Sequence, residues 1–132
     1  MVLFMDAKTY QDPERIESLA EVEFDALPFG AIKLDINGQV LQYNAYEARL
    51  AKRDPKLVIG RNFFTEVAPC TNVQEFAGRF RSGVDAGALS VTFPYRFAFP
   101  ERYVDVEITM MLAAGGTGAW VFVKEKGLTT TR

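Results

Sequence analysis

The stretch that decides the fold is Ser90-Val91-Thr92-Phe93-Pro94-Tyr95-Arg96-Phe97-Ala98-Phe99. Large apolar side chains fall at every second position with smaller or polar ones between them, which is the period of a β-strand. The same alternation returns from Val104 to Leu112, and Pro100-Glu101-Arg102 between the two runs predicts a turn. Pro94 has no backbone N–H, so the first of these strands is expected at a sheet edge or a bulge.

Three further strands are predicted from the same kind of pattern. Residues 31–35 lead into Asn37-Gly38, a pair typical of a hairpin turn, and residues 40–43 return as the partner strand. The glycine-rich turn at 115–118 leads into the last strand, Trp120-Val121-Phe122-Val123.

Short helices are predicted between the two groups of strands. Asn44 can cap a helix near 45–50, and Asp54-Pro55 opens another that ends at Gly60. A short helix and then a loop are expected over 61–70, and a longer helix over 74–86. This order predicts an α+β domain whose five-stranded antiparallel sheet carries several short helices on one face.

The two ends of the chain are expected to lie outside this core. Residues 1–26 predict a weakly packed N-terminal helical cap, in which Asp12-Pro13 begins a short acidic helix. The core then covers 27–126, and the polar tail 127–132 is expected to be disordered.

Composition excludes several classes of site. Of the 132 residues 48% are hydrophobic, which is enough for one packed domain, and the net charge of −2 argues against a general nucleic-acid or anionic-membrane surface. There is no histidine and only one cysteine, so Ser-His-Asp and Cys-His catalysis, His-ligated haem, iron–sulfur clusters and disulfides are not expected. No membrane span or signal peptide is recognisable, which predicts a soluble cytoplasmic protein.

Three side chains are candidates for a binding site. Cys70, the single cysteine, is either an inert packed thiol or a reactive attachment point. Tyr43 and Glu47 lie four residues apart, one turn if the segment is helical, and each has an ordinary alternative as a surface tyrosine or a solvated acid.

Specific motifs link these residues to a known family. The motifs are Leu27-Pro28-Phe29-Gly30-Ala31-Ile32, Leu41-Gln42-Tyr43-Asn44-Ala45, Arg53-Asp54-Pro55, Val58-Ile59-Gly60, Asn62-Phe63-Phe64, Val67-Ala68-Pro69-Cys70-Thr71 and Trp120-Val121-Phe122-Val123-Lys124. Over about residues 26–126 the chain closely resembles the photoactive yellow protein family, which comprises blue-light receptors of the PAS fold.

The resemblance implies a cofactor and a set of residues around it. It implies p-coumaric acid (4-hydroxycinnamic acid) joined to Cys70 as a thioester, hydrogen-bonded by Tyr43 and Glu47 and covered by Arg53. Ala51 stands where relatives commonly have a threonine that braces the tyrosine. The expected apolar walls are Ala45, Phe63, Phe64, Val67, Ala68, Pro69, Phe97 and Val121.

The implied function is light sensing without enzymatic turnover. Trans–cis isomerisation, proton transfer from Glu47 and loosening of the cap are the expected signal. Burial is expected to raise the pKa of Glu47, whose carboxyl can donate a hydrogen bond only when it is protonated. The segment 99–103 is shorter than usual and lacks a methionine that speeds recovery, so altered and slower recovery is expected.

Two alternatives stay open, a PAS-like sensor for another small ligand and an interaction module without chromophore. Flavin–thiol photochemistry is not expected, because Phe63 stands where flavin-type domains place a cysteine. A monomer or weak homodimer is expected, with no nucleic acid, metal or membrane bound, and the downstream signalling partner stays unknown.

Overall fold

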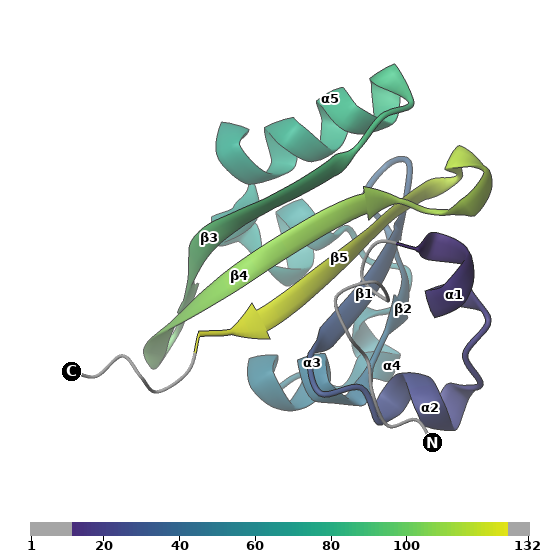
Figure 1. The fold of residues 1–132 in the computed structure, drawn as a ribbon. Coiled ribbons are helices and arrows are strands. Elements are labelled where there is room, and N and C mark those ends of the chain that lie inside the picture. Colours follow the sequence, from purple (N-terminus) through teal and green to yellow (C-terminus); the bar gives the residue numbers. More distant parts are fainter. Residues whose placement is uncertain (1–11, 127–132) are drawn as a thin grey trace.

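The structure is a computed structural model that describes residues 12–126, and its centre is an antiparallel sheet (Figure 1). The sheet has five strands within these residues, in the order β2-β1-β5-β4-β3. The strands are β1 (Gly30–Asp35), β2 (Val40–Tyr43), β3 (Ser90–Phe99), β4 (Arg102–Leu112) and β5 (Gly118–Glu125). The predicted α+β fold is confirmed. Pro94 lies in β3, which is an edge strand, as its missing backbone N–H predicted.

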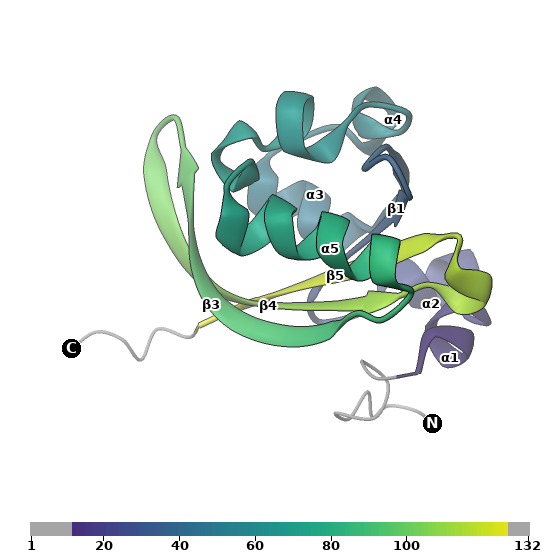
Figure 2. The ribbon, with the colours of Figure 1, turned by 90° about the horizontal axis from the view of Figure 1, so that it is seen from above.

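The helices that follow β2 cover one face of the sheet, here called the inner face (Figure 2). They include α3 (Ala45–Ala51), α4 (Pro55–Val58) and α5 (Arg79–Ala86). Asn44 and Asp54 cap α3 and α4 as predicted, and Gly87 ends α5 in the left-handed conformation (φ 69°). The connections between them differ from the expectation of ordinary helix and loop: Phe63–Val67 and Gln74–Gly78 are π-helical turns, and Pro69–Thr71 is a 3₁₀ turn.

The N-terminal helices cover part of the opposite, outer face. These are α1 (Pro13–Glu17) and α2 (Glu21–Asp25), two short helices where the sequence predicted one. Ile16, Phe24 and Leu27 pack with Trp120 and Phe122 in a second apolar cluster. Within the described part of the cap, α1 buries Ile16 beside Trp120 of β5, whereas α2 has no fully buried side chain.

The turn between β3 and β4 is tighter than the sequence suggested. β3 extends to Phe99 and β4 begins at Arg102, so Arg102 belongs to the strand and only Pro100 and Glu101 connect the two.

Within residues 12–126, no helix combines the length and apolar character needed to cross a membrane.

Candidate functional site

A cavity of about 680 Å³ lies between the inner face of the sheet and the segments around α3 and Cys70. Its inner wall holds buried side chains, among them Tyr43, Glu47 and Phe97. Its other end is lined by exposed residues, among them Lys52 and Glu101. This size and mixture of apolar walls with a few polar groups are typical of a small-molecule site.

Glu47 is the most unusual group in this cavity. Its backbone N–H donates to the Asn44 cap (3.1 Å), which fixes the first turn of α3 and turns the Glu47 side chain into the protein. The side chain is 2% exposed, and its Oε1 has no hydrogen-bond partner among the described residues. Burial, helped by the charge of Glu125, raises the pKa of Glu47 to about 8. The expected upward shift is confirmed, so at neutral pH the carboxyl is mostly protonated and can donate.

Gly30 gives the Glu47 carboxyl its room. A Cβ at this position of β1 would lie 2.0 Å from Glu47 Oε1, closer than any real contact. The backbone of β1 therefore forms one side of the carboxyl's space, and only glycine leaves that space open.

Tyr43 stands at the end of β2 and lines the same cavity. It is 6% exposed, and burial raises the pKa of its phenol well above the usual value, with the neighbouring Glu47 charge adding to this effect. Arg53 acts in the opposite direction. A phenol that does not ionise keeps its proton and remains a hydrogen-bond donor.

Cys70 lies in the 3₁₀ turn and is half-buried at the cavity wall. The Tyr95 hydroxyl donates to the Cys70 carbonyl (2.5 Å), and the Thr71 hydroxyl donates to the carbonyl of Ala68 (2.7 Å). These bonds fix the backbone on which the thiol sits. The sequence predicted only a strand position for Tyr95, because a strand pattern does not show where a terminal hydroxyl reaches.

Arg53 is exposed at the open end of the cavity, and its guanidinium donates to the carbonyl of Val67 (2.8 Å). This bond joins the segment after α3 to the π-helical turn across the cavity. Ala51 lines the cavity in the last turn of α3.

Most of the predicted walls line this cavity, and three do not. The lining includes Phe63, Val67, Ala68, Pro69 and Phe97. The other three lie elsewhere: Ala45 borders a different hollow beside the cap, Phe64 packs against Phe63, Phe76 and Phe80, and Val121 is fully buried in β5. Neighbours in sequence point in different directions on a π-helical turn, which the motif alone does not show.

The cavity also has walls that the sequence did not identify, namely Lys52, Ala98, Phe99, Pro100 and Glu101. Four of these belong to the β3–β4 turn or the strand end before it. Its contact with α3 joins positions about fifty residues apart, for which the sequence carries no periodic signal.

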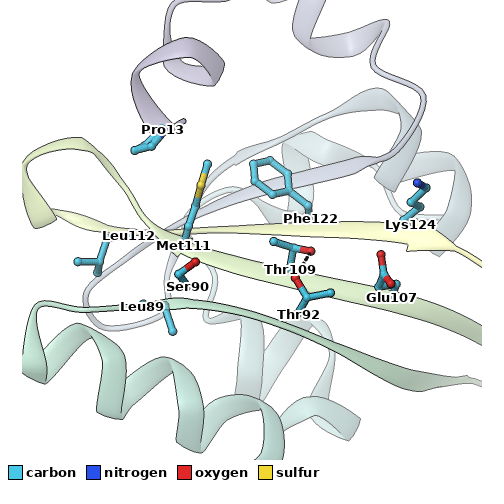
Figure 3. Close-up of a pocket in the computed structure, with 10 residues that line it drawn as sticks. All are labelled: Pro13, Leu89, Ser90, Thr92, Glu107, Thr109, Met111, Leu112, Phe122 and Lys124. Atoms are coloured by element: carbon cyan, nitrogen blue, oxygen red, sulfur yellow. Dashed lines mark hydrogen bonds between the residues drawn. The ribbon is translucent and has the colours of Figure 1, made fainter. Parts of the chain in front are cut away.

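Another hollow, of about 440 Å³, lies on the outer face, and none of the predicted site residues lines it (Figure 3). Its floor is the outer side of β3, β4 and β5, including the paired hydroxyls of Thr92 and Thr109 (3.0 Å). Residues 12–126 contain no group of three or more Cys, Asp or Glu side chains placed to hold a metal ion.

Comparisons with known proteins agree with the fold and with the motifs around the cavity. The model of the PAS fold matches residues 19–125. The photoactive yellow protein of Halochromatium salexigens is 46% identical over 109 residues, 83% of this chain and 87% of that protein. That of Rhodothalassium salexigens is 45% identical over 106 residues, 80% of this chain and 85% of that protein.

A solved structure extends this similarity to three dimensions. The photoactive yellow protein domain of the sensor histidine kinase Ppr from Rhodospirillum centenum superposes with a TM-score of 0.83 at 46% identity. The match covers 86% of this chain and the whole of that domain. The chain therefore belongs to the photoactive yellow protein family, within the PAS fold.

Proposed function

We propose that this chain is a blue-light photoreceptor that carries a p-coumaroyl group as a thioester on Cys70. The observation that carries the proposal is the Glu47 carboxyl, which is buried in a cavity wall and whose Oε1 has no hydrogen-bond partner within residues 12–126. A buried polar atom of this kind is costly unless a ligand pairs with it. Family membership supports the identity of the ligand, and the side chains present fit it.

When bound, a p-coumaroyl thioester supplies a light-isomerisable double bond conjugated to a phenolate, which absorbs in the blue. Tyr43 and protonated Glu47 are the donors suited to stabilise a buried anion, because hydrogen bonds to a charged acceptor are the strong kind. Phe63 and Phe97 exclude water, and Arg53 covers the open end.

In this proposal the signal begins when Glu47 gives up its proton. A carboxylate at this site would be buried beside Glu125 and unpaired on Oε1, which costs several kcal/mol, on the scale of a small domain's stability. Partial unfolding of the N-terminal cap is the proposed response, and the chain acts as a sensor and not as an enzyme.

Asn44 supplies a direct connection from Glu47 to the cap. Its Oδ1 accepts from the N–H groups of Glu47 (3.1 Å) and Ala31 (3.0 Å). Its Nδ2 donates to the carbonyls of Phe24 (3.1 Å) and Phe29 (3.0 Å), the first of which belongs to α2. A shift of the first turn of α3 would therefore weaken a bond that holds α2.

The test is to mix the apoprotein with activated p-coumaric acid and record intact mass and absorption. We expect one adduct and a blue band that bleaches and recovers, and Cys70→Ala to remove both. Glu47→Gln should keep the adduct and shift the band. A folded chain that forms no adduct would overturn the photoreceptor proposal and favour a sensor for another ligand.

A further inference from the structure

One arginine fastens the β3–β4 turn to the end of α3. Arg102, the first residue of β4, donates through Nη2 to the backbone carbonyl of Leu50 in α3. Its Nη1 donates to Glu101 Oε2 (2.9 Å), and its guanidinium lies 4.7 Å from the ring centre of Phe99. The side chain is only 30% exposed, so these three contacts hold it in one place.

A weaker link lies beside it. Lys52 Nζ pairs with Glu101 Oε2 at 3.3 Å, with both side chains more than half exposed. Lys52 ends α3 in the left-handed conformation (φ 56°), unusual for a residue with a Cβ. An exposed ion pair contributes little by itself, so Arg102 carries most of the attachment.

The attached segments form two sides of the open end of the cavity. Ala51, Lys52 and Arg53 line it from the α3 side, and Phe99, Pro100 and Glu101 line it from the turn. Arg102 does not line the cavity, but both segments that it joins do. The width of this opening therefore depends on the bond between the β3–β4 turn and Leu50.

We propose that Arg102 is a gating residue that holds this opening narrow and so limits how fast a molecule from solvent reaches Cys70. The turn opens when the guanidinium leaves the Leu50 carbonyl, and a molecule from solvent then reaches the half-buried Cys70 faster. This role concerns access alone and holds whichever ligand the cavity binds, so its failure is separable from failure of the proposed function.

The test measures Cys70 reactivity in the full chain purified without chromophore. The thiolate of Cys70 attacks one sulfur of 5,5′-dithiobis(2-nitrobenzoic acid), a mixed disulfide forms and a coloured thionitrobenzoate leaves. Because the chain has one cysteine, every equivalent released reports this site. We expect Arg102→Ala to react about tenfold faster, the order of effect for losing a hydrogen bond from a charged group.

Matched variants separate gating from general destabilisation. Arg102→Lys keeps one donor and should fall between wild type and Arg102→Ala, and Lys52→Ala should change the rate by less than about threefold. Arg96→Ala removes a bidentate pair with Asp105 on the same hairpin (2.7 and 3.1 Å) that does not touch α3, and should leave the rate unchanged.

Low concentrations of urea identify the kind of opening that exposes Cys70. A local opening exposes little surface, so the accelerated rate in Arg102→Ala should barely depend on urea. The proposal is overturned if folded Arg102→Ala reacts at the wild-type rate. It is equally overturned if Arg96→Ala reacts as fast, or if the urea dependence equals that of global unfolding.

Discussion

Two glutamates, one on each side of the sheet, have opposite surroundings. Glu17, on the outer face, accepts hydrogen bonds through Oε2 from the Trp120 indole (2.9 Å) and the Ala114 N–H (3.0 Å), and its Oε1 lies 3.6 Å from Lys33 Nζ. Glu47, on the inner face, lies against Gly30, and its Oε1 finds no hydrogen-bond partner in the part of the chain that the structure describes.

The electrostatic consequences are opposite as well. Partial burial by itself raises the pKa of Glu17, but the bonds from Ala114 and Trp120 and the Lys33 charge outweigh it and leave the pKa below its usual value. Burial raises the pKa of Glu47 to about 8. The outer carboxylate therefore attaches the cap, whereas the inner carboxyl keeps a proton that a ligand can use.

The largest expected effect is on the pH dependence of stability, through Glu47→Gln. The unfolded carboxyl ionises near 4.5 while the folded one ionises near 8. Between these two pKa values the unfolded state therefore binds fewer protons than the folded state. The free energy of unfolding of the ligand-free chain falls by about 4 kcal/mol as the pH rises through this range. Above about 8 the loss is complete. Urea unfolding from pH 5 to 9 should show this fall in wild type and not in Glu47→Gln.

Glu107→Gln is the matched control, because Glu107 is an exposed acid on the outer side of β4. It should keep the wild-type slope. A Glu47→Gln variant whose stability falls as steeply as wild type would mean that Glu47 is ionised in the folded chain at neutral pH.

These two glutamates also mark how far the sequence could be interpreted. The strand alternation, the Asn37-Gly38 turn and the caps Asn44 and Asp54 are local signals, and the structure follows them. Glu47 was identified through its spacing from Tyr43 and through the family resemblance, and its raised pKa follows from burial. Glu17 was not identified, because its partners Ala114 and Trp120 are about a hundred residues away. The π-helical turns were missed since their extra residue per turn leaves no clear apolar period.

The second expected effect, about 2–3 kcal/mol, belongs to Glu17→Ala. The substitution leaves the Trp120 indole N–H and the Ala114 N–H without their acceptor, and Trp120 is fully buried. Urea unfolding should show the loss, and amide exchange in 13–26 should rise because the cap loses its attachment. Trp120 is the only tryptophan, so a red shift of its emission reports solvent entry.

Glu21→Ala, an exposed change on α2, should cost only a few tenths of a kcal/mol through the helix dipole. If the two variants lose the same stability, Glu17 does not attach the cap. The pH dependence should also identify the contribution of Glu17. Because folding lowers the pKa of Glu17, this group stabilises the folded chain at pH values above its unfolded pKa, and the stabilisation disappears as the pH falls through its folded pKa. The contribution of Glu17 is thus lost in acid, whereas the penalty at Glu47 grows toward alkaline pH.

The smallest expected effect comes from Glu125→Gln. Glu125 accepts from the Tyr46 hydroxyl (2.5 Å), and its charge is the second cause of the raised pKa of Glu47, after burial. Removing that charge should move the end of the stability loss to lower pH, while most of the shift remains because burial is unchanged. The same urea series measures this, and Glu107→Gln again controls for a change in net charge. If Glu125→Gln returned Glu47 to ordinary behaviour, charge repulsion would be the main cause, and the inner carboxyl would be set by its neighbours as Glu17 is.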